Sequence, residues 1–441
     1  MKTLLYLLIP IILSSCSQDF LDVKPSSNTV VPTTLDDFQQ LLDYGNIVFA
    51  YPDMLDVLAD DYYLEETYWS SRAVMVKNAH IWADDIFETI ESDLPNWERN
   101  YSQIFYANVV LEGVDKLTKD AKNEKQYNQV KGSAHFLRAW ALYNLMQLYA
   151  PAYNLTTAAV DLGVPIPLKS DVNEPVKRNS VAEVYQRILD DLTLAGGLVQ
   201  TDVDYSRPSK AVVYALHARV LLAMGNYEQA LILSTNSLKE YHTLIDLNIG
   251  VLDYRKTLYL GFDPNGPFVQ VNNQNIQIVD ILYNSYSTND LRLRFFRLNT
   301  VGKPYRIASH ALSNYNYRGL DTDEQYLIKA ESQAYLDQVD DAMETLNYLL
   351  KHRIDKASFT ALRASNKEEA LLLIRQERRK ELLFRGVRWM DLKRYNREGA
   401  NITLSRKLGD KVYTLPPNSD KWLFPIPPNE IKTSGIDQNP R

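Results

Sequence analysis

The chain has 441 residues, with 48 Lys and Arg against 55 Asp and Glu, and a formal net charge of −7. Its 45 % hydrophobic and 23 % charged residues are typical of a packed globular protein and exclude wholesale disorder. The mild acidity argues against a nucleic-acid partner, which requires clustered Lys and Arg. One cysteine excludes an intramolecular disulfide and a CxxC-type zinc site.

Residues 1–15 have the pattern of a signal peptide. Lys2 is the only charge before Asp19, and an apolar run from Leu4 to Leu13 follows it. This run is too short to span a bilayer. It ends at Leu13-Ser14-Ser15-Cys16, which has the shape of a lipobox, so we expect Cys16 to be the lipid attachment site. The alternative is an ordinary secretory signal with an accidental cysteine.

Helical patterns dominate from residue 34 onward. Apolar residues at helical spacing predict helices over 35–42, 97–117, 128–150, 181–195 and 368–384. Two segments share one spacing of residues. Tyr214, Ala218 and Ala230 in the first segment correspond to Tyr326, Ala330 and Ala342 in the second. A bulky residue followed by small residues at this spacing is the tetratricopeptide pattern, in which alanines let two antiparallel helices touch.

We therefore predict a mostly α fold. Tetratricopeptide-like helix pairs form a scaffold over about 128–240 and 323–385, with loop-rich inserts at about 45–95, 151–179 and 244–320 and a few short strands. The strands are expected in the last insert, around 268–271 and 277–279. The helical repeats would supply stability and the irregular inserts would supply function.

Signals of an enzyme are missing. Glu377 and Glu381 lie one helical turn apart, but Arg375, Arg378, Arg379 and Lys380 surround them, which favours structural salt bridges over an acid/base pair. The six histidines have no HExxH or paired-ligand spacing, and no GxSxG or phosphate loop is present. We expect no catalysis, no metal and no cofactor.

Aromatic residues interleaved with polar ones indicate a ligand surface. A sugar ring packs its C–H bonds on a flat aromatic face, while its hydroxyls bind polar side chains. The densest cluster lies at 62–85 and the second at 283–292. The expected ligand-binding residues are Trp82 and Trp69, which rank first, with Tyr63, Tyr68, Arg72, Asn78, Tyr283 and Tyr286. The alternative is that several of these rings only pack on the scaffold.

Four blocks carry a family resemblance. They are Cys16 with 20–25; Trp97, Tyr101, Ile104 and Asn108; 374–382 with Gly386, Arg388, Asp391 and Arg394; and 424–427 with Glu430 and Asn439-Pro440. In this order they resemble the SusD/RagB family of Bacteroidetes outer-membrane lipoproteins. This chain is shorter than many members. The resemblance implies one SusD-like domain over 16–441.

The resemblance also implies a function and a place. Such a protein is lipid-anchored in the outer membrane, faces the cell exterior, and captures a nutrient oligomer for a SusC-like TonB-dependent barrel. An oligosaccharide is the expected ligand. A peptide ligand, as in the RagB branch, and a scaffold that binds only protein are the alternatives.

Overall fold

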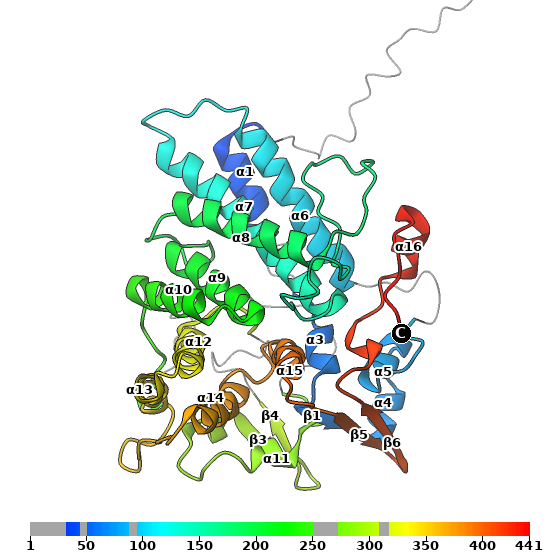
Figure 1. The fold of residues 1–441 in the computed structure, drawn as a ribbon, viewed down its shortest axis with the longest axis vertical. Coiled ribbons are helices and arrows are strands. Elements are labelled where there is room, and N and C mark those ends of the chain that lie inside the picture. Colours follow the sequence, from blue (N-terminus) through cyan, green and yellow to red (C-terminus); the bar gives the residue numbers. More distant parts are fainter. Residues whose placement is uncertain (1–31, 45–50, 88–94, 250–271, 308–316) are drawn as a thin grey trace, which may run out of the picture.

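A computed structural model describes residues 32–44, 51–87, 95–249, 272–307 and 317–441 (Figure 1). Cys16 and the segment 268–271 lie outside these residues. The helices are α1 (Leu35–Leu42), α3 (Met54–Leu58), α4 (Glu66–Ser70), α5 (Val74–His80), α6 (Pro95–Val114), α7 (Glu124–Tyr149), α8 (Val181–Leu198), α9 (Lys210–Met224), α10 (Tyr227–Glu240), α11 (Asp280–Tyr283), α12 (Thr322–Tyr335), α13 (Val339–Leu350), α14 (Lys367–Glu381), α15 (Arg388–Arg397) and α16 (Pro428–Ser434).

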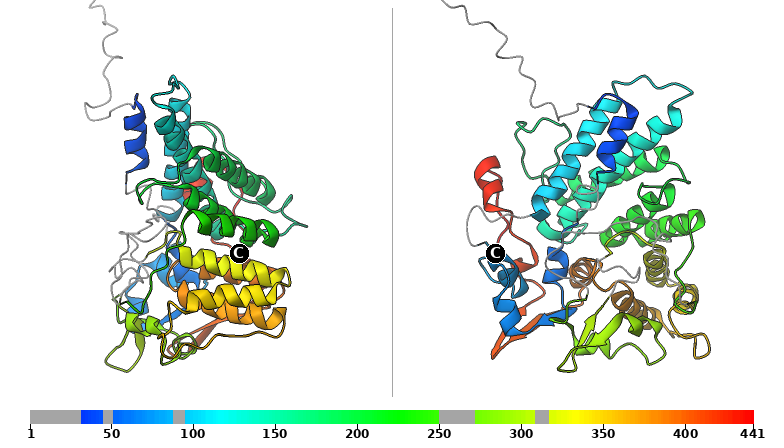
Figure 2. Two further views of the ribbon diagram at one scale, coloured as in Figure 1. Left: turned by 90° about the vertical axis from the view of Figure 1, so that its left-hand side faces the viewer. Right: turned by 180° about the vertical axis from the view of Figure 1, so that it is seen from behind.

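Antiparallel helix pairs build the scaffold, as the sequence predicts. Helix α7 packs against α6 and α8, α9 against α10, and α12 against α13 and α14. Figure 2 shows the layers, with α9 and α10 directly above α12. The fold is therefore mostly α and tetratricopeptide-like. Within the described residues, no helix is long and apolar enough to cross a membrane.

Small residues make the close helix contacts that the two repeats predict. Ala218 and Ala330 are fully buried, as are the alanines twelve residues after each. Gly225 ends α9 in the left-handed region at φ 81°, and Asp337 occupies the same place after α12 at φ 60°. Aspartate tolerates this conformation better than most residues, so the turn is retained without glycine.

Short strands lie over one end of the scaffold. A four-stranded antiparallel sheet has the order β1-β2-β4-β3, built from β1 (Tyr62–Leu64), β2 (Ile276–Ile278), β3 (Phe296–Leu298) and β4 (Pro304–Arg306). Tyr63 pairs with Gln277, so the sheet joins the first insert to the third. A hairpin of β5 (Leu404–Leu408) and β6 (Lys411–Leu415) lies near this sheet at the bottom of Figure 1.

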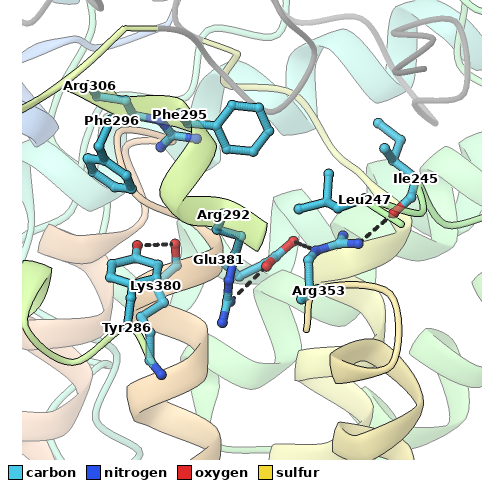
Figure 3. A pocket seen from close by; sticks show the side chains of 10 residues that line it. All are labelled: Ile245, Leu247, Tyr286, Arg292, Phe295, Phe296, Arg306, Arg353, Lys380 and Glu381. Carbon is cyan, nitrogen blue, oxygen red and sulfur yellow. Dashed lines mark hydrogen bonds and ion pairs between the residues drawn. The ribbon is translucent and has the colours of Figure 1, made fainter. Parts of the chain in front are cut away.

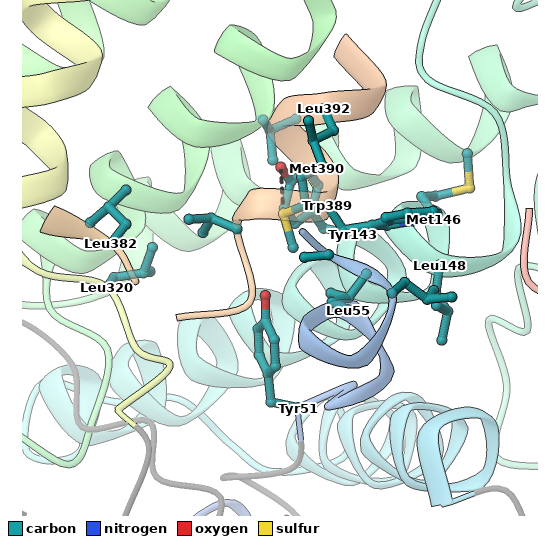
Figure 4. Packing of buried hydrophobic residues seen from close by; sticks show 14 of the residues in the cluster. Tyr51, Leu55, Tyr143, Met146, Leu148, Leu320, Leu382, Trp389, Met390 and Leu392 are labelled. Atoms are coloured by element: carbon teal, nitrogen blue, oxygen red, sulfur yellow. Dashed lines mark hydrogen bonds between the residues drawn. The ribbon is translucent and has the colours of Figure 1, made fainter. Parts of the chain in front are cut away.

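The hydrophobic core joins α3, α7 and α15 (Figure 4). Trp389 of α15 is fully buried and stacks on Trp422, with ring centroids 4.5 Å apart. Tyr143 of α7 reaches the same region, where its hydroxyl contacts the sulfur of Met390 at 3.8 Å. This core fixes the N-terminal segment that carries the predicted aromatic cluster.

Candidate functional site

Three of the predicted aromatic residues lie on two consecutive elements and are partly exposed. Tyr63 is on β1, and Tyr68 and Trp69 are on the short helix α4 that follows; all three side chains are half-buried. Helix α4 buries none of its five residues, which explains why the helical periodicity of this region is weak. These rings therefore have surface that a ligand can reach.

Polar groups hold each ring in place. The Arg72 guanidinium lies 4.2 Å from the centroid of the Tyr68 ring, and the Tyr68 hydroxyl accepts a hydrogen bond from Asn273 Nδ2 at 2.8 Å. Trp69 Nε1 donates to the carbonyl of Lys77 at 3.1 Å. Fixed rings lose little conformational entropy when a ligand binds, and this favours affinity.

The third insert completes this surface. Lys303 Nζ lies 5.9 Å from the centroid of the Tyr63 ring and forms an ion pair with Asp280 at 3.0 Å. Burial raises the pKa of the Tyr63 hydroxyl, which therefore stays protonated at neutral pH. We call Tyr63, Tyr68, Trp69, Arg72, Asn273 and Lys303 the aromatic face. Residues 63–72 and 273–303 meet there although about 200 residues separate them.

Trp82 is a correction to the predicted site. Its ring is 1 % exposed, its Nε1 donates to the Leu58 carbonyl at 3.1 Å, and the Arg406 guanidinium lies 4.5 Å from its centroid. The ring closes the core below α5, so neither of its faces is available to a ligand. Asn78 is half-buried, and its Nδ2 lies 3.5 Å from the Ile86 carbonyl, which gives it a local structural contact.

The second predicted cluster also packs into the scaffold. Tyr286 is 6 % exposed, and its hydroxyl donates to the Lys380 carbonyl at 2.9 Å. Tyr283 is half-buried and packs edge-on against Phe296, with centroids 5.6 Å apart. Tyr286 is therefore a wrong prediction, while Tyr283 keeps only part of its ring exposed.

A buried ion-pair cluster lies close to Tyr286, and Figure 3 shows its members Arg292, Arg353 and Glu381. Arg292 donates to Asp290 at 2.7 Å, to Glu377 at 2.7 Å and to Glu381 at 3.0 Å. Arg353 donates to the other oxygen of Glu381 at 2.7 Å. The structural interpretation of the two glutamates is confirmed, although their main partners are distant arginines and not only their helical neighbours.

Sequence reasoning missed a pocket beside α6. It has a volume of about 600 Å³ and lies between α6, the loop that joins α7 to α8, and α16. Trp97, Tyr101 and Phe105 line it at intervals of four residues along α6. That spacing of aromatics was visible in the sequence as one helical face. Among the described residues, no three His, Cys, Asp or Glu side chains are grouped to hold a metal ion.

The chain is similar to proteins of one family along most of its length. A model described as "Starch-binding associating with outer membrane" matches residues 19–222, and one described as "SusD family" matches residues 308–441. The SusD-like protein P2 of Formosa agariphila is 29 % identical over 136 residues, which are 30 % of this chain and 25 % of that protein. The match thus spans a quarter of that relative's length.

Solved structures share the fold. A putative sugar binding protein from Bacteroides vulgatus superposes with a TM-score of 0.75 at 21 % identity, over 93 % of this chain and 99 % of that one. Surface glycan-binding protein A from Bacteroides fluxus gives a TM-score of 0.70 at 19 % identity, over 93 % and 100 %. The two family models together match residues 19–222 and 308–441, and this chain belongs to the SusD/RagB family.

Proposed function

We propose that this protein captures an oligosaccharide at the outer surface of the outer membrane and delivers it to a SusC-like TonB-dependent barrel. The observation that carries the proposal is the aromatic face, where Tyr68 and Trp69 are fixed by Arg72, Lys77 and Asn273. Such a face offers stacking surface for sugar rings and nearby donors for their hydroxyls. The name of the similar Bacteroides fluxus protein, a surface glycan-binding protein, supports the same ligand class.

Attachment at Cys16 would place the protein at the membrane. Acylation requires a thiol directly after the signal-peptide core, and the single cysteine of the chain lies at that position. Acyl chains contribute about 0.8 kcal/mol for each buried methylene, so two or more chains give a stable anchor. A Cys16→Ala variant should leave the membrane fraction for the soluble or secreted fraction, which immunoblotting of fractionated cells measures.

Affinity electrophoresis in gels that contain neutral and acidic polysaccharides tests the ligand class. The chain without residues 1–16 should be retarded by at least one glycan, and Trp69→Ala should migrate faster in that gel. Tyr205→Ala is the matched control, because it removes a 39 % exposed ring that lies outside the aromatic face.

The alternative functions predict different results in these experiments. Retardation by no glycan together with binding to a peptide library would favour a peptide ligand. Binding of neither, with recovery of a protein partner unaffected by Trp69→Ala, would favour a protein-only scaffold. Turnover of any polymer by the pure chain would contradict a binding role without catalysis.

A further inference from the structure

The pocket beside α6 has a rigid aromatic floor. Trp97 and Tyr101 lie with ring centroids 4.7 Å apart, and Tyr101 donates its hydroxyl to the Pro165 carbonyl at 3.1 Å. Trp97 Nε1 donates to Glu430 of α16 at 3.2 Å, which ties the opposite wall to the floor. These bonds hold both walls of the pocket in place.

The loop between α7 and α8 forms the other wall and is fastened to α6 at two points. Asn108 Nδ2 donates to the carbonyls of Pro167 and Lys169, both at 3.0 Å. Glu112 accepts hydrogen bonds from the Ser170 N–H at 2.8 Å and from its hydroxyl at 2.6 Å. These bonds fix the backbone of the loop at residues 167–170.

Two exposed aliphatic side chains lie on the stretch of this loop, 165–176, that borders the pocket. Val172 is 81 % exposed and Leu168 is 48 % exposed. Apolar groups grouped beside a pocket with a polar rim mark interaction sites. Aliphatic side chains offer no flat face for a sugar ring, so a protein segment suits this wall better than a glycan does.

The charges of the pocket select the partner. Its lining contains four carboxylates, those of Glu98, Asp171, Glu174 and Glu430, and one ammonium group, that of Lys169, which pairs with Glu174 at 2.8 Å. The local potential is therefore negative. A segment that carries Lys or Arg is complementary to it, whereas an acidic segment is repelled.

The loop lies beside the first described residues of the chain. Ser170 lines a second pocket together with Pro32 and Thr33, the first residues that the structure describes. Fifteen residues lie between Cys16 and Pro32, so a lipid on Cys16 would lie at most about 55 Å from Pro32, given the reach of an extended chain. A partner embedded in the same membrane is within reach here.

We propose that this α6 groove, meaning Trp97, Tyr101, Phe105, Asp171 and Val172 with the exposed Leu168 beside it, binds an extended Lys- or Arg-containing segment of the barrel partner. The inference rests on the proposed function, because it takes the anchor and the barrel from it. The groove and the aromatic face have no residue in common.

Site-specific photocrosslinking in cells that produce the full chain tests this surface. A benzophenone side chain at Val172 should crosslink to the barrel that co-purifies with the wild-type chain. The matched control is Val412 on β6, which is 60 % exposed at the end of the molecule opposite α1 (Figure 1) and should give at least tenfold less of that product. Asp171→Lys should lower barrel recovery at least fivefold, and Asp410→Lys in the β5–β6 turn should not.

Each other outcome has a defined meaning. Crosslinking to the barrel from Val412 and not from Val172, or from Val172 to a polysaccharide or a different protein, overturns the groove proposal and leaves the proposed function intact. If Asp171→Lys leaves the recovery of the barrel unchanged, the charge argument is wrong and the proposed function remains intact. Absence of any co-purified barrel with the wild-type chain overturns both.

Discussion

Replacing Arg292 with methionine tests the buried ion-pair cluster. The cluster contains three carboxylates, Asp290, Glu377 and Glu381, and three cations, Arg292, Arg353 and Lys380, so its charge is balanced. Burial by itself lowers the pKa of Arg292, but the charges of Glu377 and Asp290 hold it well above its usual value. Arg292→Met keeps most of the side-chain volume and leaves one buried carboxylate uncompensated.

The expected loss follows from that imbalance. Removing one partner of a buried pair costs about 3–5 kcal/mol, because the remaining charge is desolvated without compensation. The free energy of unfolding, measured by urea titration with circular dichroism, should fall by this amount at pH 7.5. Arg297→Met, at an exposed position on β3, is the control and should change it by less than about 0.5 kcal/mol.

A loss below about 1 kcal/mol would refute the assignment of this cluster as a main stabilising element.

Further substitutions test three separate features. Gly386→Ala should lower the free energy of unfolding by about 2–4 kcal/mol, because φ is 73° and the new Cβ would overlap a buried tyrosine ring. Gly302→Ala is the control: φ is 77°, but the new Cβ meets no atom within 4 Å, so the loss should be about 1–2 kcal/mol. Glu331 has a pKa of about 2, since the charge of Arg394 outweighs burial, which by itself raises it. Its stabilising contribution is present above the unfolded pKa near 4.5 and is lost toward pH 2, so Glu331→Gln should flatten the acid-unfolding curve there. Trp82→Ala should lower the free energy of unfolding by about 3–5 kcal/mol, and a loss below 1 kcal/mol would contradict its place in the core.

Local patterns explain what the sequence could predict. The spacing of Ala218 and Ala330 predicts close helix pairs because this spacing has a direct geometric meaning along a helix. The partners of Glu377 and Glu381 were not predictable in the same way, since Arg292 and Arg353 reach them from distant elements. Ion pairs between distant segments leave no periodic signal.

The candidate site shows the same limit. Trp82 lies among polar residues in the sequence, which made its surroundings seem too polar for a core. Asp60 and Asp61, which belong to the same polar stretch of sequence, form ion pairs with distant arginines. Arg388 pairs with Asp60 at 2.7 Å and Arg379 pairs with Asp61 at 2.8 Å. Trp82 is 1 % exposed, and only the tertiary structure reveals this burial.

Isothermal titration of a glycan that retards the chain, against the wild-type protein and Trp69→Ala, tests the central claim most directly. Truncating an aromatic ring at a binding hot spot costs 1.4 kcal/mol or more, which is about tenfold in Kd. We predict that Trp69→Ala raises Kd at least tenfold and leaves the free energy of unfolding within about 1 kcal/mol. An unchanged Kd would contradict the assignment of the aromatic face as the glycan-binding surface.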